Sequence, residues 1–323
     1  KDLLNLEYEA LYDIPVQKDI RHSVVEWDLV NPDEGTGIVH IAPGCGEEDF
    51  ELGKKLNAQV ISPLDESGNF LEGYGDLTGE YANKVADKVI DFLTTRNSLY
   101  KVEPCIHSYP HCWRCKTKCL FRLVENWFID CQKIKDGLKK LAGEVRWIPD
   151  FVGKRMENWL ENMGDWMISR KRFYGLALPF YKCKKCGKLT VVGSKEELRT
   201  LAVNPEKIDA LPSLHRPWID EIKIKCPGCG NETERIKDVG DCWLDAGVVP
   251  FSTLKYFEDK SYWNQWYPAD AIGEMVEQVR LWYYSMLVYG FIFENKVPYK
   301  TVFNNVEVRD EKGERMSKTK RNG

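Results

Sequence analysis

Long hydrophobic runs, internal repeats and low-complexity segments are all missing from this sequence. No stretch of about eighteen consecutive apolar residues occurs among its 323 residues, so we expect no transmembrane helix. The opening Lys1-Asp2-Leu3-Leu4 lacks the apolar core of a signal peptide. The absence of repeats excludes solenoid arrays. We therefore expect a globular chain of two domains, or of one domain with insertions.

A strong charge bias is missing as well. The sequence has 46 Lys and Arg residues against 50 Asp and Glu residues, which gives a net charge of −4. A nucleic acid would therefore have to be bound by local basic patches rather than by overall attraction. The chain does not begin with Met, and its last residues follow a lysine-rich loop. We interpret it as a piece of a longer protein.

Cysteine, by contrast, is plentiful. Eleven cysteines would suit a secreted disulfide scaffold, but several of them form C-x-x-C pairs, and the chain is too long to need disulfide staples. Metal binding in a reducing compartment is the better interpretation. We therefore expect a cytoplasmic protein.

Two of the pairs belong to C-x-x-C-G sequences, at residues 183–187 and 226–230. A glycine after the second cysteine lets backbone amides turn toward the sulfurs. Four thiolates leave no open coordination position, so the spacing predicts a structural zinc site, and the alternative is four unliganded thiols. The expected ligands are Cys183, Cys186, Cys226 and Cys229.

A further pair, Cys112 and Cys115, lies near other cysteine and histidine residues. Two ligands at this spacing are half of a tetrahedral zinc site. The residues alone leave two interpretations open, a bound metal or two free thiols in a loop.

The stretch from Asp165 to Gly175, DWMISRKRFYG, places three consecutive cations between aromatic residues. This interleaving suits a polyanion with exposed bases, such as a nucleotide or a single-stranded RNA end. The simpler interpretation is a solvated basic turn. Residues 176–181 are expected to form an apolar strand after the turn.

Residues 35–43, GTGIVHIAP, are typical of a β-branched strand that ends at proline, and a helix is expected to follow from Glu47 to Leu56. His40 and Asp49 could converge on a small ligand, with the carboxylate on an ammonium group and the imidazole on a hydroxyl or a water. The alternatives are a hydrogen-bonded strand histidine and an acid that offsets the helix dipole.

In residues 238–250, DVGDCWLDAGVVP, Asp241 and Asp245 flank Trp243 at alternating positions. Alternation of this kind indicates one face of a strand. The simpler interpretation is a core tryptophan beside two capping acids.

Residues 273–287 predict a helix with an acidic first turn. Glu274, Gln278 and Trp282 would share one face of it at i, i+4 and i+8, and the alternative is an ordinary amphipathic helix with a buried tryptophan. Residues 313–320, GERMSKTK, form a basic loop suited to phosphates that develop charge in a transition state.

In this order the stretches resemble motifs of class I aminoacyl-tRNA synthetases of the isoleucine, valine and leucine subgroup. ISRKRFYG resembles I-S-R-Q-R-x-W-G, with Lys171 in place of Gln and Tyr174 in place of Trp. GTGIVHIAPGCGEEDF is similar to the editing signature of the isoleucyl enzymes, and YPHCWRC to a motif whose cysteines bind zinc with an earlier pair. DVGDCWLDAG, GEMVEQVRLWY and GERMSKTK resemble D-V-x-D-V-W-F-D-S-G, E-G-x-D-Q-x-R-G-W-F and K-M-S-K-S.

The resemblance implies an α/β fold. It implies the C-terminal half of a Rossmann-like nucleotide-binding domain, with part of an inserted β-rich editing domain and a zinc ribbon. The implied segments are the editing part over 1–102, a cysteine-containing return segment over 103–181, the zinc ribbon over 182–236 and the catalytic half over 237–323. The half with the H-x-G-H motif and the anticodon-binding region would lie outside this chain.

The resemblance also implies a role for each matching residue. His40 falls on the editing histidine, and Asp49 on the acid that holds the α-amino group of a mischarged amino acid. Trp243 and Trp282 fall on the walls of the isoleucine side-chain pocket. Glu274 falls on the residue that contacts the aminoacyl-adenylate, and Gln278 on a glutamine of the same pocket. Ser317 and Lys318 fall on residues that bind ATP. Of these, Glu274 and Lys318 are the implied catalytic residues.

The implied reaction is ATP-dependent activation of isoleucine, its transfer to tRNA(Ile), and hydrolysis of mischarged valyl-tRNA. A second, hydrolytic site is needed because one methylene gives a pocket only weak discrimination, a known property of the isoleucyl enzymes. Zinc is the implied metal, ATP would enter with Mg²⁺, and neither a membrane nor DNA is implied. The alternatives are a valyl or leucyl sibling, or a non-catalytic zinc-ribbon RNA-binding or deacylase module.

Overall fold

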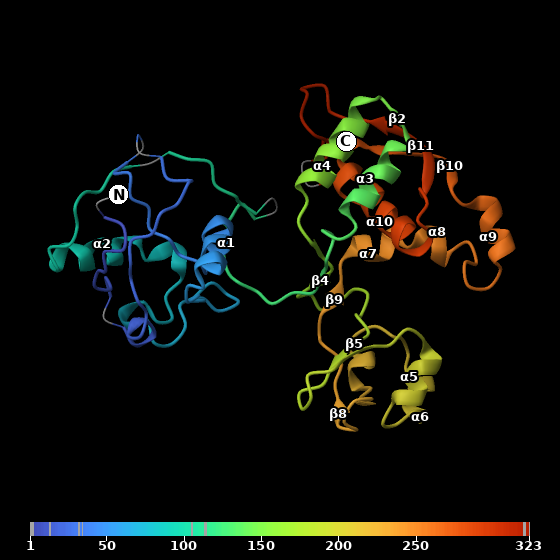
Figure 1. Ribbon diagram of the computed structural model, residues 1–323, viewed down its shortest axis with the longest axis horizontal. Helices are drawn as coiled ribbons and strands as arrows, with labels where there is room; N and C mark the ends of the chain where they lie inside the picture. The colour runs from blue at the N-terminus through green and yellow to red at the C-terminus, as the bar shows by residue number, and fades with distance from the viewer. Residues whose placement is uncertain are drawn as a thin grey trace. The chain divides into compact units, whose positions relative to one another are not determined.

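The computed structural model describes residues 3–12, 14–31, 33, 35–104, 106–112, 115–318 and 321–322. The chain divides into two compact units, residues 1–125 and 126–323, and each is described by itself (Figure 1). Within the described ranges, no helix has the length and apolar character needed to cross a bilayer.

The first unit consists of short helices joined by irregular segments. Its α-helices are α1 (Glu47–Leu56) and α2 (Ala86–Thr95), and its 3-10 helices are η1 (Pro15–Gln17), η2 (Gly75–Leu77) and η3 (Ala82–Lys84). The predicted helix from Glu47 to Leu56 is confirmed. Its first turn carries three acids, which offset the helix dipole, and the chain leaves it through Asn57 at a left-handed φ of 51°.

Residues 35–43 do not form the predicted strand. Strand pairing among the described residues of this unit is limited to isolated bridges, such as that of Glu7 with Ser23. Ile38 and Val39 are 64% and 51% exposed. A β-branched run becomes a strand only where a neighbouring strand supplies hydrogen bonds and an apolar face, and no described residue pairs with this run. The β-rich character expected for this part of the chain is therefore not seen among its described residues.

A three-stranded parallel sheet organises the second unit. Its strand order is β10 (Ala269–Met275), β11 (Tyr299–Asn305) and β2 (Arg146–Ile148). In the register, Val302 of the central strand lies between Ile272 and Trp147. Parallel sheets are built with helices on their faces, so this arrangement confirms the predicted α/β fold class.

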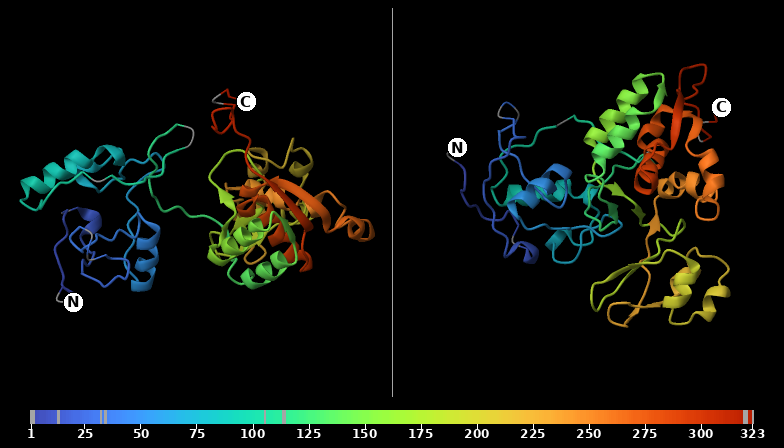
Figure 2. Two further views of the ribbon diagram at one scale, coloured as in Figure 1. Left: turned by 90° about the horizontal axis from the view of Figure 1, so that it is seen from above. Right: turned by 45° about the vertical axis from the view of Figure 1, so that its right-hand side comes forward.

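Helices α3 (Lys135–Gly143), α4 (Phe151–Asn162) and α10 (Trp282–Glu294) form one apolar core with the sheet. α10 is apolar all round, and Tyr283 and Leu287 on it are completely buried, as expected for a helix inside a core. Figure 2 shows the green helices α3 and α4 beside the orange and red α10, β10 and β11.

The remaining strands pair antiparallel. They are β1 (Phe128–Ile129) with β3 (Trp166–Met167), β4 (Ser169–Arg170) with β9 (Val239–Gly240), β5 (Phe180–Lys182) with β6 (Leu189–Val191), and β7 (Ile224–Lys225) with β8 (Glu232–Thr233). Of the strand predicted over residues 176–181, Phe180 and Tyr181 belong to β5, while Ala177 forms only an isolated bridge with Val239. Pro179 between them has no amide hydrogen to donate to a ladder.

The segment between β6 and β7 packs with β5 and β7 in a small core of its own, in which Ile208 and Ile224 are almost completely buried. Its helices are α5 (Lys195–Leu201), α6 (Glu206–Asp209) and η4 (Trp218–Glu221). The other short elements are α7 (Cys242–Gly247), α8 (Val249–Ser252), α9 (Lys260–Trp266) and η5 (Val276–Arg280).

Candidate functional site

The four cysteines of the two C-x-x-C-G sequences lie together. Each pair sits on a tight turn that follows a short strand, and in each turn the glycine amide donates to the carbonyl of the first cysteine. The Gly187 bond to Cys183 measures 2.9 Å, and the Gly230 bond to Cys226 measures 2.8 Å. Both glycines have left-handed φ values, 73° and 71°, which side chains disfavour.

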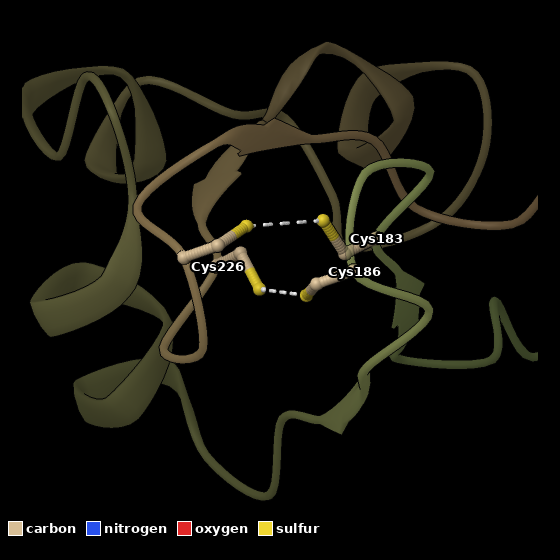
Figure 3. A group of neighbouring side chains, drawn as sticks. Cys183, Cys186 and Cys226 are labelled. Atoms are coloured by element: carbon tan, nitrogen blue, oxygen red, sulfur yellow. Dashed lines mark hydrogen bonds between the residues drawn. The ribbon is translucent and has the colours of Figure 1, made fainter.

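The sulfurs of these four residues all lie within 4.8 Å of one another. Figure 3 shows Cys183, Cys186 and Cys226 turned toward a common centre. Cys183 lies 3.6 Å from Cys229, and Cys186 lies 3.6 Å from Cys226, measured between the Sγ atoms. A tetrahedral ion with bonds of about 2.3 Å to sulfur fits this arrangement, and four sulfurs leave no position for a substrate.

Backbone amides prepare this cluster for a cation. The amide of Cys186 lowers the pKa of the Cys183 thiol to about 6, and the amide of Gly228, 3.4 Å from the Cys226 sulfur, lowers the pKa of that thiol. The amide of Lys188 also bonds Cys186, but the neighbouring sulfurs raise the pKa of Cys186 to about 11. The backbone amides therefore favour the thiolate form of Cys183 and Cys226, the form that binds zinc.

Cys112 and Cys115 lie on a turn with the same backbone hydrogen bonds. The Lys116 amide donates to Cys112 at 2.8 Å, and the Cys112 amide donates to Thr117 at 2.8 Å. Lys116 takes the left-handed φ of 62° that glycine has in the other two turns. The Thr117 hydroxyl, 3.3 Å from the sulfur, lowers the pKa of the Cys115 thiol to about 7. Among the described residues, no third ligand joins this pair, so it remains half of a site.

Two of the three cations at residues 170–172 form ion pairs within the fold. Arg170 pairs with the buried carboxylate of Asp241, and Lys171 lies 2.8 Å from Asp238. Both acids come from the DVGDCWLDAG stretch, which pairs with the basic stretch through β4 and β9. These two cations therefore join two motifs rather than face a polyanion.

The aromatic residues after these cations are more open. Phe173 and Tyr174 are 61% and 74% exposed. The Arg216 guanidinium lies 4.9 Å from the centre of the Phe173 ring, and the Tyr174 ring stacks on His215 at 5.4 Å with an interplanar angle of 6°. The turn therefore contacts the segment between β6 and β7.

Trp243 lies in the first turn of a helix and not on the predicted strand. Asp241 caps α7, and its carboxylate accepts the Trp243 amide at 2.8 Å. The alternation of Asp241, Trp243 and Asp245 predicted a strand, and this prediction is wrong. Strand β9 ends at Gly240, and the Asp241 cap starts a helix there. The three side chains therefore do not share one face.

Glu274, Gln278 and Trp282 do not share one helix. They lie in β10, η5 and α10 respectively, because β10 stays paired with β11 through Met275 and Leu281 interrupts the helix with a φ of −125° and a ψ of −107°. The predicted i, i+4, i+8 face is wrong.

The chain nevertheless brings several of these residues to one end of the sheet. Glu274 is exposed near the carboxyl end of β10, opposite Asn304 of β11. The Gln278 side-chain oxygen accepts the Trp282 amide at 3.2 Å, and the Trp282 indole donates to Ala246 of α7 at 3.1 Å. Trp282 therefore lies against the helix that carries Trp243.

The basic loop with Ser317 and Lys318 follows β11. Asp310 holds one side of the loop, where its carboxylate accepts the amides of Lys312 at 3.0 Å and Glu314 at 2.8 Å. Asn322 holds the other side and accepts the Ser317 amide at 3.0 Å. Lys318 is exposed, while Thr319 and Lys320 lie outside the described residues.

His40 and Asp49 lie close along the chain at α1. The Asp49 carboxylate accepts the amide of Ala42 at 3.0 Å and so fixes the turn that follows His40. His40 itself is exposed.

Sequence reasoning missed two sets of polar residues. Asp238 and Asp241 hold the basic stretch, and a single sequence carries no signal for which acids its cations meet. Asp310 and Asn322 organise the basic loop, where an aspartate and a glycine before the lysines indicated a turn.

Comparison with known proteins places the chain among the synthetases. The family described as tRNA synthetases class I (I, L, M and V) matches residues 8–323. The isoleucine–tRNA ligase of Methanothermobacter thermautotrophicus is 40% identical over 308 residues, which are 95% of this chain and 29% of that protein. The isoleucine–tRNA ligase of Sulfolobus acidocaldarius is 39% identical over 327 residues, 100% of this chain and 31% of that protein.

Among solved structures, the ternary complex of Agrobacterium radiobacter K84 agnB2 LeuRS with tRNA and LeuAMS is 26% identical. It has a TM-score of 0.36 and covers 50% of this chain and 22% of that chain. The chain thus spans roughly a third of the length of the curated relatives named above. Since the family match covers nearly the whole sequence, this chain belongs to the class I aminoacyl-tRNA synthetases of the isoleucine, leucine, methionine and valine group.

Proposed function

We propose that this chain is part of an isoleucine–tRNA ligase and carries the C-terminal half of its adenylation site. The sheet topology supports this best. Glu274 lies near the end of β10, and the loop with Ser317 and Lys318 follows β11, the parallel neighbour of β10. Open α/β sheets bind their ligands at the carboxyl ends of neighbouring strands.

Isoleucine would lie between Trp243 and Trp282. The indole of Trp282 is fixed on α7 by its hydrogen bond to Ala246, and Trp243 belongs to the same helix. Two indole faces would offer an apolar slot to a branched aliphatic side chain. Gln278 would orient Trp282 through its backbone amide, and the exposed carboxylate of Glu274 would hold the ammonium group.

ATP would enter with Mg²⁺ and meet the loop at Ser317 and Lys318. The hydrogen bonds that Asp310 and Asn322 accept shape this loop without using the Lys318 ammonium group. A cation beside the leaving pyrophosphate gains most as negative charge grows there, so Lys318 would stabilise the transition state more than the ground state. The activated isoleucine would then pass to tRNA(Ile).

The four-cysteine cluster would hold a structural Zn²⁺. The geometry and the lowered thiol pKa values of Cys183 and Cys226 fit that ion. Cys112 and Cys115 would bind a second zinc only with two ligands from outside the described residues.

The α1 region would belong to an editing site that hydrolyses valyl-tRNA. One oxygen of the Asp49 carboxylate is used by the Ala42 amide, which would leave the other for the ammonium group of the amino acid. His40 would orient the attacking water or the terminal ribose hydroxyl.

A double dissociation tests these assignments in the full-length protein. Lys318→Ala should lower isoleucine-dependent pyrophosphate exchange by about 100-fold or more and leave the hydrolysis of valyl-tRNA unchanged. Asp49→Ala should lower the hydrolysis of valyl-tRNA and leave isoleucine-dependent pyrophosphate exchange unchanged, because the two sites are separate. Equal loss of both activities in either variant would contradict the assignment, and so would pyrophosphate exchange by this chain alone, which lacks the H-x-G-H half.

A further inference from the structure

Helix α7 approaches α10 closely at Gly247, its buried last residue (Figure 1). A Cβ atom on Gly247 would lie 2.7 Å from both the Cβ and the Oγ atom of Ser285, and 3.0 Å from Cδ2 of Tyr289. Non-bonded carbon atoms are best separated by about 3.5–4.0 Å. The contact between the two helices therefore requires a glycine on α7 and a small side chain opposite it on α10.

Side chains of α10 also hold two backbone carbonyls of α7. The Tyr289 hydroxyl donates to the Leu244 carbonyl at 2.8 Å. The Trp282 indole donates to the Ala246 carbonyl at 3.1 Å. The last four carbonyls of a helix lack partners within it, and both acceptors are among them. Burial raises the pKa of Tyr289 to about 12, so its phenol keeps the proton that it donates.

The two helices carry the two walls of the proposed isoleucine slot. Trp243 belongs to α7 and Trp282 to α10, so the distance between the helices sets the distance between the two indoles. A helix of six residues has little stability of its own, and its position depends on what it packs against. Ser285 is completely buried, and its hydroxyl donates to the Trp282 carbonyl at 3.1 Å. This side chain therefore has no room to move away from α7.

We infer that Gly247 determines the width of the isoleucine slot and that Tyr289 holds α7 at that width. The inference rests on the proposed function. Both are positioning residues, because they act through the place of Trp243 rather than through contact with the amino acid. A slot of this width contacts the methylene by which isoleucine exceeds valine, and a wider slot loses that contact. Since one methylene in an apolar pocket is worth about 10–200-fold, the width acts on the preference for isoleucine over valine.

The test is amino-acid-dependent pyrophosphate exchange by the full-length protein without tRNA, measured with isoleucine and with valine. In Gly247→Ala, the new methyl group should push α7 away from α10 by about 1 Å. The preference for isoleucine over valine in kcat/KM should fall about tenfold. A raised KM for isoleucine should account for most of the loss, with kcat changed less than about twofold.

Two further variants calibrate this result. Tyr289→Phe removes only the hydroxyl that holds Leu244 and should lower the preference about threefold. Gly143→Ala is the matched control, because a Cβ atom at this glycine of α3 would meet nothing within 4 Å. It should leave the preference unchanged.

Ser285→Gly supplies a rescue that separates slot width from general stability. It removes the Cβ and Oγ atoms that the new methyl group would meet. The double variant Gly247→Ala with Ser285→Gly should therefore recover most of the preference. A glycine inside a helix lowers stability, so a merely destabilising effect of Gly247→Ala would become worse in the double variant.

An unchanged preference in Gly247→Ala, or an equal loss of exchange with both amino acids, would overturn the inference. If Gly247→Ala does not fold, an unchanged preference in Tyr289→Phe would overturn it instead. The unsubstituted protein tests the proposed function separately. Absence of isoleucine-dependent exchange there would contradict that function, whereas a preference that is present there and survives both substitutions contradicts only the role of the slot width.

Discussion

The four-cysteine cluster and the end of the parallel sheet differ in how far along the sequence their bonds reach. Each cysteine turn is closed by backbone bonds between close neighbours, such as the Cys183 amide with Lys188 at 2.9 Å. At the sheet end, the indole of Trp282 donates to Ala246, 36 residues away. The first geometry is therefore set locally, and the second depends on the core that positions α7, α10 and β10.

The same difference separates their sources of stability. The sheet end rests on a large apolar core that includes α3, α4 and α10. The segment around the cysteines has a much smaller core. A structural metal often stabilises a domain with so small a core. We therefore expect loss of the metal ion to destabilise the cysteine region and to leave the stability of the parallel sheet unchanged.

Removal of two cysteines should have the largest effect. Cys183→Ser with Cys226→Ser should abolish tight zinc binding, which contributes about 10–16 kcal/mol in small zinc-dependent folds at neutral pH. Metal analysis after dialysis should find no zinc, and hydrogen exchange should show lost protection in β5 through β8. Amides of β10 and β11 should keep their protection, because their core does not include the cluster.

The matched control is Cys112→Ser with Cys115→Ser. This pair has the same turn but no third described ligand, so the variant should keep the zinc of the four-cysteine cluster. If zinc content fell equally in both variants, the assignment of the tight site to the four-cysteine cluster would be wrong.

Trp282→Ala should have the next largest effect, and it acts on the other region. It removes a half-buried indole and leaves the Ala246 carbonyl without its donor, a loss of about 3 kcal/mol in local stability. Exchange at the Leu244 amide of α7 should accelerate, while the Gly187 and Gly230 amides should not change. Trp282→Phe keeps the packing and should cost only about 1 kcal/mol. Exchange at the Leu244 amide that is no faster in Trp282→Ala than in the unsubstituted chain would mean that the indole does not stabilise α7.

The sequence predicted the cysteine cluster better than the sheet end for this physical reason. The C-x-x-C-G spacing contains its own turn geometry, so the ligand residues could be named directly. The spacing of Glu274, Gln278 and Trp282 indicated one helix, but pairing with β11 keeps Glu274 in a strand. Tertiary pairing overrode local periodicity there.

In the first unit, the sequence predicted a strand that is not found among the described residues. Residues 35–43 have the composition of a strand, yet no described residue pairs with them. The helix at Glu47 was predictable because its acids and its glycine boundary are local signals. The ion pairs that Lys171 and Arg170 make were not predictable, since nothing in a single sequence says which acids a cation meets.

Arg170→Ala tests how the two motifs are joined. It leaves the Asp241 carboxylate, only 5% exposed, without its cation, which should cost about 2–3 kcal/mol. Exchange at the Asp241 amide, bonded to Ile168 at 2.8 Å, should accelerate. Arg172→Ala is the control, because this exposed side chain pairs with no described acid, and its effect should stay within about 0.5 kcal/mol. A larger loss of stability in Arg172→Ala than in Arg170→Ala would mean that the ion pair with Asp241 does not join the two motifs.

Lys116→Gly should have the smallest effect, and it compares the turn at Cys112 with the two turns of the cluster. Lys116 holds a φ of 62° where Gly187 and Gly230 have 73° and 71°. Glycine removes a left-handed strain of about 1 kcal/mol but gains freedom in the unfolded chain, so the net change should be a stabilisation below about 0.5 kcal/mol. The reverse change, Gly187→Ala, adds the strain and should destabilise its turn by about 1 kcal/mol. The amides of residues 116 and 187 each donate to the first cysteine of their turn. Their hydrogen-exchange rates measure the change in stability that each substitution causes. A destabilisation in Lys116→Gly as large as that in Gly187→Ala would mean that the Lys116 side chain, rather than its backbone angle, supports the turn.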